Sequence, residues 1–162
     1  MARGIELKSR AQMRVMARSG HITAEALAAA SAAAVPGATT ADVDAAARRV
    51  IETAGATSNF LGYHGFPAVT CVSVNHEVVH GIPGDLEIAD GDVVSIDCGA
   101  IVDGWHSDSA VTVIAGAARG GQDTHLVKST RDALWAGIAT LATAQRLDEV
   151  AGAIEDVADA AG

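Results

Sequence analysis

Two aspartates, Asp97 and Asp108, lie in consecutive segments, residues 93–102 and 105–114, whose composition and alternation predict β-strands. The Asp103-Gly104 pair between the segments is typical of a two-residue hairpin turn. With that turn, the two aspartates become diagonal neighbours on one face of the ribbon, with Cβ atoms about 7 Å apart or somewhat less. Two carboxylates at that spacing can converge on shared divalent cations.

The two faces of this predicted ribbon differ in polarity. The face without the aspartates is the more apolar one, and we expect it to pack against helices. The other face has apolar ends and a polar middle, an arrangement that suits oxygen ligands inside walls that exclude water. A polar face exposed to solvent is equally typical of antiparallel sheets, and a three-residue turn would separate the aspartates. The hairpin alone therefore leaves a metal site and a solvated surface as alternatives.

Helices are predicted on both sides of these strands. Ser9 with Gln12 and Thr39 with Asp42 form capping-box patterns, and each precedes a run of apolar residues at helical spacing. We expect the first helix to end before Pro36-Gly37, and two further helices after Gly120-Gly121 and from about Leu147. Residues 40–55 and 147–162 align without gaps at three apolar positions and a terminal glycine. This alignment predicts that the helix pair is an internal repeat.

Between the helix pairs, residues 56–83 are punctuated by glycine and proline, and only residues 68–74 are predicted to form a strand. A loop-rich segment of this kind commonly carries contact residues.

Composition narrows the class of protein. The 162 residues suit one domain, and the formal net charge of −9 comes with no basic patch, which argues against direct binding to nucleic acid. The two cysteines, Cys71 and Cys98, are too few for a disulfide framework and favour a reducing compartment. Residues 1–10 lack the apolar core of a secretory signal, and we predict no membrane span. These features favour a cytoplasmic protein.

Three segments carry a longer pattern. They read Gly-Tyr-His-Gly-Phe-Pro at residues 62–67, Cys-Val-Ser-Val-Asn-His-Glu-Val-Val-His-Gly-Ile-Pro at residues 71–83, and Ser-Ile-Asp-Cys-Gly-Ala at residues 95–100, followed by Asp-Gly-Trp-His-Ser-Asp at residues 103–108. In this order and spacing the chain resembles the type I methionine aminopeptidases of bacteria over essentially its whole length. The motifs are long and specific, unlike a single short motif.

The resemblance implies an α/β (α+β) architecture, the pita-bread fold, in which two pseudo-symmetric halves surround a curved antiparallel sheet. We expect residues 1–162 to form a single, incomplete catalytic domain, comprising the first half and the helix pair of the second. The implied activity is hydrolytic removal of the initiator methionine from the N-termini of nascent polypeptides, with the ribosome as a candidate place of encounter. The implied cofactors are two divalent metal ions, such as Co, Mn, Fe or Zn, which activate a water molecule.

The resemblance also assigns roles to individual residues. Asp97 corresponds to a carboxylate bound mainly to one metal, and Asp108 to the carboxylate that bridges both. His80 corresponds to a histidine that contacts the substrate and steadies the reacting intermediate. The pocket for the methionine side chain is expected to include Tyr63, Phe66 and Cys71, whose aromatic and sulfur groups suit a thioether.

Two positions depart from the family pattern. Phe60 stands where some relatives have a small thiol residue, which leaves the pocket shape open. Ser107 stands where glycine is common, and it is expected to face the helices with little effect.

The family's other metal ligands are a histidine and two glutamates, and we expect all three to arise after the point where this chain stops. The later acidic and histidine residues are better explained as helix caps and solvated faces; they are Asp123, His125, Asp132, Asp148, Glu149, Glu155, Asp156 and Asp159. The isolated chain is therefore expected to be weakly stable and nearly inactive. Two alternatives are a non-catalytic module of the same fold that binds nascent chains or ribosomes, and a proline-specific peptidase.

Overall fold

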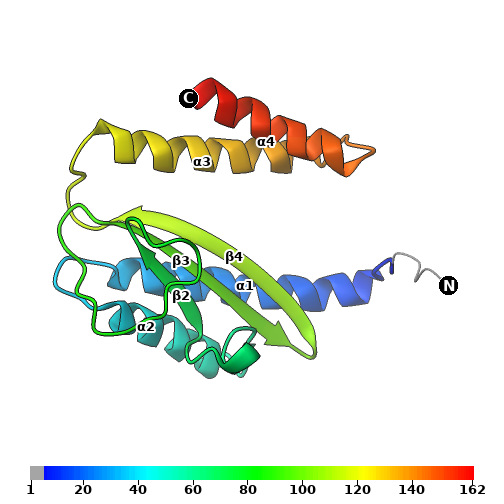
Figure 1. Ribbon diagram of the computed structural model, residues 1–162. Coiled ribbons are helices and arrows are strands. Elements are labelled where there is room, and N and C mark those ends of the chain that lie inside the picture. Colours follow the sequence, from blue (N-terminus) through cyan, green and yellow to red (C-terminus); the bar gives the residue numbers. More distant parts are fainter. Residues whose placement is uncertain (1–5) are drawn as a thin grey trace. The chain divides into compact units, whose positions relative to one another are not determined.

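The computed structural model describes residues 6–162 (Figure 1). Residues 1–10 were predicted to lack a secretory signal, and the first five of them lie outside the described residues. The described chain forms two compact units, residues up to Ala117 and the unit Ala118–Gly162. Within residues 6–162, no helix combines the length and the apolar character needed to cross a bilayer.

The first unit begins with two capped helices. α1 (Arg10–Ala33) is capped by Ser9, and α2 (Thr40–Thr53) is capped by Thr39, with both predicted capping boxes formed. α1 ends three residues before Pro36, whose ring restricts the preceding residue to extended conformations. The two predicted helix starts are confirmed.

The sheet of the first unit is antiparallel, and its central strand is β3 (Val93–Val102). β3 pairs along its full length with β4 (Trp105–Ile114), and along its other edge with β1 (Thr57–Ser58) and β2 (Thr70–Val74). The predicted limits of β3 and β4 are confirmed. β2 starts two residues later than predicted, and β1 is too short to give an alternating pattern.

Asp103 and Gly104 close the β3–β4 hairpin in two residues. Both have left-handed φ angles, 50° and 78°, as a type I′ turn requires. Val102 pairs with Trp105, so Asp97 lies opposite Ala110 and Asp108 opposite Gly99. The predicted register is confirmed.

The core of the first unit lies between the sheet and the two helices. The helix-facing side chains of β3 are buried, as the apolar pattern predicted. The buried residues include Ala26, Ala30, Val43, Ala47, Ile51, Val94, Ile96, Cys98 and Ala100. Small alanines let α1 and α2 approach the sheet closely. The aspartates are left on the face that points away from these helices.

Ser107 faces α1, as predicted, but it has polar partners there. Its hydroxyl lies 2.8 Å from the Ser19 hydroxyl and 2.7 Å from the Thr23 hydroxyl, and Ser19 donates to the Ala100 carbonyl at 2.7 Å. These hydroxyl groups satisfy one another between helix and sheet, so the contact carries no unpaired polar group at Ser107.

The second unit contains α3 (Gly121–Thr140) and α4 (Leu147–Ala161), which pack against each other. Gly137 allows the close approach, because a Cβ there would lie 2.9 Å from the Ile154 side chain. Two acidic side chains of this unit are solvent-accessible, as expected for solvated helix faces, and each has a basic partner: Asp132 pairs with Lys128, and Asp148 with Arg146. The two helices confirm the predicted helix pair.

Candidate metal and peptide site

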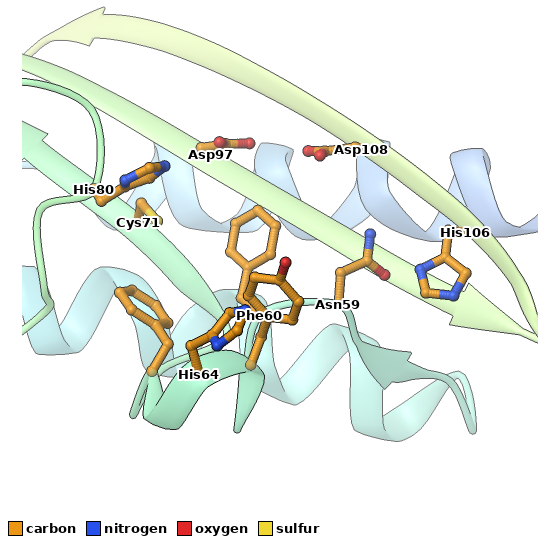
Figure 2. Close-up of a pocket in the computed structure, with 10 residues that line it drawn as sticks. Asn59, Phe60, His64, Cys71, His80, Asp97, His106 and Asp108 are labelled. Atoms are coloured by element: carbon orange, nitrogen blue, oxygen red, sulfur yellow. The ribbon is translucent and has the colours of Figure 1, made fainter.

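A cavity of about 510 Å³ lies on the aspartate face of the sheet (Figure 2). Its lining joins residues of the loop after β1, the strands β2, β3 and β4, and the segment after β2. The lining residues are Asn59, Phe60, Tyr63, His64, Phe66, Cys71, His80, Asp97, His106 and Asp108. All six residues predicted for the site by resemblance line this cavity. Their chemical roles stay predictions.

Asp97 and Asp108 line the cavity from adjacent strands, β3 and β4 (Figure 2). Burial is the main cause that raises the pKa of Asp97 to about 6, followed by the charge of Asp108 and a hydrogen bond to its carboxyl group. The backbone of Cys98 and the charge of His80 act in the opposite direction. Two carboxyl groups are thus held close enough to disfavour full ionisation.

This pair fits a divalent cation, because a positive ion would remove the repulsion that raises the pKa of Asp97. Asp97 and Asp108 would be its ligands. Within residues 6–162, no cluster of three or more His, Cys, Asp or Glu side chains has the arrangement of a metal site.

Cys71 lies on β2 directly opposite Asp97 and is buried. Burial, then the charges of Asp97 and Asp108, raise the pKa of the Cys71 thiol to about 11. The thiol therefore stays protonated near neutral pH and acts as an apolar wall. It is a wall of the cavity and has no feature of a nucleophile.

Aromatic rings form another wall. Phe60 and Phe66 meet edge to face with ring centroids 6.4 Å apart, and Tyr63 packs edge to face on His64 at 4.4 Å. A tight turn holds them: the Gly62 N–H donates to the Phe66 carbonyl at 2.8 Å. Gly62 has φ of 85°, a conformation open to glycine. The predicted pocket residues Tyr63 and Phe66 are joined by Phe60, which the sequence had left open.

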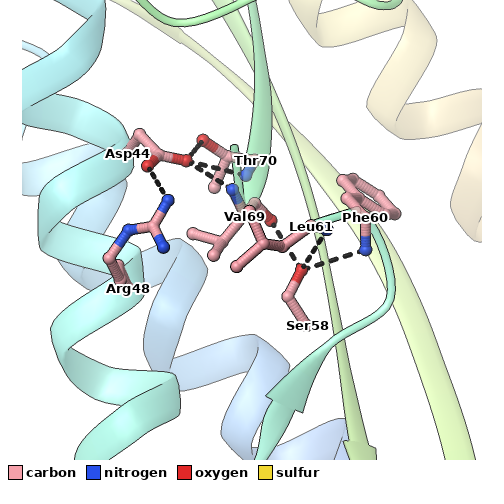
Figure 3. A network of polar contacts seen from close by, with 7 residues as sticks. All are labelled: Asp44, Arg48, Ser58, Phe60, Leu61, Val69 and Thr70. Atoms are coloured by element: carbon pink, nitrogen blue, oxygen red, sulfur yellow. Dashed lines mark hydrogen bonds and ion pairs between the residues drawn. The ribbon is translucent and has the colours of Figure 1, made fainter. Parts of the chain in front are cut away.

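Polar contacts anchor both ends of this aromatic loop (Figure 3). At the start, the Ser58 hydroxyl accepts the Phe60 N–H at 3.0 Å. At the end, Asp44 of α2 accepts the backbone N–H groups of Val69 and Thr70 at 2.9 and 2.8 Å. Asp44 also accepts the Thr70 hydroxyl at 2.8 Å and pairs with Arg48 at 3.1 Å. These contacts fix the start of β2. They thereby fix the position of the next residue, Cys71, which lines the cavity.

Four lining residues were not predicted as site residues: Phe60 and His64, which belong to the aromatic wall, and Asn59 and His106. Asn59 donates from Nδ2 to the Ser107 carbonyl at 2.7 Å and lies over Gly99, where a Cβ would be 2.4 Å from that nitrogen. His106 lies on β4 on the aspartate face. The sequence did contain a signal for His106. It lies two residues before Asp108 on β4, and side chains two residues apart on a strand lie on the same face. Asn59 had none, because its place depends on the absence of a side chain at Gly99.

Known proteins resemble this chain over most of its length. Residues 14–162 match the model of metallopeptidase family M24. Over 154 residues the chain is 48% identical to methionine aminopeptidase 1 of Mycobacterium tuberculosis, covering 94% of this chain and 58% of that protein. It is 37% identical to a methionine aminopeptidase of Clostridium perfringens, covering 98% of this chain and 63% of the relative.

A solved structure, the methionine aminopeptidase of Thermotoga maritima, superposes with a TM-score of 0.80 at 36% identity, over 83% of this chain and 54% of that one. The chain belongs to metallopeptidase family M24, a family of metal-dependent peptidases. The predicted resemblance to bacterial methionine aminopeptidases and the predicted pita-bread fold class are confirmed. The chain spans about three-fifths of the length of these curated relatives.

Proposed function

We propose that this chain contributes the Asp97–Asp108 part of a methionine aminopeptidase site, which hydrolyses the N-terminal methionine of nascent polypeptides. The main support is that two carboxyl groups on one face of a hairpin adjoin a cavity lined by aromatic and sulfur groups. A free amino terminus is attracted by the carboxylates, and a thioether side chain packs well against such walls.

In this proposal the residues of the cavity have three separate roles. Asp97 and Asp108 hold the divalent ions, which number two in the family pattern, and when bound these ions supply an activated water. His80 lines the cavity close enough to Asp97 to influence its charge, so its imidazole is suited to hold the peptide near the scissile bond. Phe60, Phe66 and Cys71 exclude water from the side-chain end of the cavity.

The proposed partner is the free N-terminus of a nascent chain, with no direct contact to nucleic acid, because the chain carries a net charge of −9. The proposed compartment is the cytoplasm. Manganese or cobalt suits the carboxylate oxygens, and iron or zinc becomes suitable when imidazole joins the ligand set.

We expect the isolated chain to hydrolyse peptide substrates slowly. Two carboxylates are too few protein ligands to hold divalent ions tightly, and the described residues offer no cluster of three. The same observation also supports a second candidate function, that of a non-catalytic module that binds methionyl peptides without metal.

Calorimetric titration with Mn²⁺ tests the metal site. Mn²⁺ should bind the chain and not the Asp97→Ala or Asp108→Ala variants, while Asp103→Asn in the exposed turn serves as a matched control. Unchanged binding in the two alanine variants would contradict the proposal. Hydrolysis of Met-Ala-Ser should be slow and should require Mn²⁺, and turnover near that of a full-length relative would contradict the expected low activity. Metal-independent binding of the tripeptide would favour the non-catalytic module.

A further inference from the structure

The segment that carries His80 folds back along β2. Asn75 starts the reversal with φ of 54°, and the Glu77 N–H donates to the Val74 carbonyl at 3.1 Å. The returning chain then meets β2, where the Val72 N–H donates to the Gly81 carbonyl at 2.9 Å. His80 is therefore carried on a short return segment outside the regular strands, and local contacts must fix its direction.

One buried hydroxyl contacts the residues on both sides of His80. Ser73 of β2 donates from Oγ to the Val79 carbonyl and accepts the Gly81 N–H at 3.1 Å. Ser73 is buried, with 6% of its surface exposed, and it does not line the cavity. The Ser73 hydroxyl thus acts as a donor to one peptide group and as an acceptor from the next, and these two peptide groups flank His80.

The backbone at these two neighbours is under constraint. Val79 has φ of 46°, a left-handed conformation that a β-branched residue rarely adopts. Gly81 has no room for a side chain, because a Cβ would lie 2.2 Å from the Val72 carbonyl oxygen. Such a conformation persists only where surrounding contacts hold it, and the two hydrogen bonds of Ser73 are contacts of this kind.

We propose that Ser73 is a positioning residue that fixes the backbone on both sides of His80 and so directs the imidazole into the cavity beside Asp97. The inference rests on the proposed function for the role of His80 in peptide binding. Ser73 touches no substrate in this view and acts only through His80.

The spectrum of His80 tests the positioning directly and needs no ligand. In histidine-labelled protein, Ser73→Ala should shift or broaden the imidazole resonances of His80, and Ser73→Thr, which keeps the hydroxyl, should restore them. Ser95→Ala is a matched control, because Ser95 pairs with Ser73 across the sheet but its hydroxyl bonds to Thr112 at 2.8 Å. If Ser73→Ala does not fold, Ser73→Cys replaces it, since the thiol is a weak donor.

A double-mutant cycle tests whether Ser73 acts through His80. In the presence of Mn²⁺, Ser73→Ala should weaken binding of Met-Ala-Ser about three- to tenfold, the range expected for one neutral hydrogen bond. In a His80→Ala background the same change should have no further effect. Equal weakening in both backgrounds, or unmoved His80 resonances in Ser73→Ala, overturns the inference and leaves the proposed function standing. Shifted resonances in a protein that binds no tripeptide support the positioning and overturn the proposed function.

Discussion

Asp97 opposes folding when no cation is bound, so replacing it with asparagine should stabilise the metal-free chain at neutral pH. The carboxyl has its pKa raised from the ordinary value of 3.8 to about 6, first by burial and then by the charge of Asp108. A raised pKa means that the folded chain binds the proton more tightly than the unfolded chain. The contribution of Asp97 to folding is then fully present below pH 4, and it is lost as the pH rises through 6.

The size of the effect follows from the same values. Two pH units correspond to about 3 kcal/mol, and since Asp97 is only half-buried, screening by solvent reduces this to about 1–2 kcal/mol. Asp97→Asn should therefore gain about 1–2 kcal/mol at pH 7.5 in a chelator, and the gain should disappear near pH 4. Mn²⁺ at a hundred times its Kd should reverse the order, because it would stabilise the wild-type chain by about 2.7 kcal/mol.

Urea unfolding is the measurement, followed by the fluorescence of Trp105, which lies on β4 of the unit that holds the site. A Trp135→Phe background removes the signal of the second unit. Asp103→Asn is the matched control, since the same substitution in the exposed turn should change the free energy of unfolding by less than about 0.5 kcal/mol. An Asp97→Asn variant that is less stable than wild type at pH 7.5 without metal would refute the electrostatic argument.

Three further outcomes are expected. Asp44→Ala removes the acceptor of three hydrogen bonds to the start of β2 and should destabilise the chain by about 3 kcal/mol in urea unfolding, with faster amide exchange at the start of β2. Gly81→Ala forces a Cβ against the Val72 carbonyl and should lower the urea midpoint, with an effect that Ser73→Thr does not relieve. Burial raises the pKa of Cys71 to about 11 and of Cys98 to about 12, so iodoacetamide at pH 8 should label both thiols only in urea.

The sequence predicted the parts of the fold that local chemistry decides. Asp103-Gly104 determined the turn, the turn determined the register, and the register put Asp97 and Asp108 on one face. The two capping boxes likewise need only residues three apart. In each case the signal and the structure lie within one element or one hairpin.

Other features depend on contacts that no local pattern encodes. Asp44 reads as one more polar residue of a helix, yet it holds backbone groups that lie 25 and 26 residues further along the chain. Asn59 reaches the cavity only because Gly99 leaves space. The loop-rich composition of residues 56–83 predicted contact residues in general, but their directions come from tertiary hydrogen bonds.

Two independent features hold the aspartates in register. This matters because the length of one turn decides whether Asp108 lies on the same face as Asp97. A turn longer by one residue would move Asp108 to the helix face and bring a neighbouring side chain into the cavity. The left-handed pair at Asp103 and Gly104 favours the two-residue turn from one end of the hairpin. Ser107 opposes a slip from the other face, because a one-residue shift would take its hydroxyl from its partners on α1 and expose a carboxylate to them. The position of Asp108 is therefore set both by its own strand and by the helix behind it.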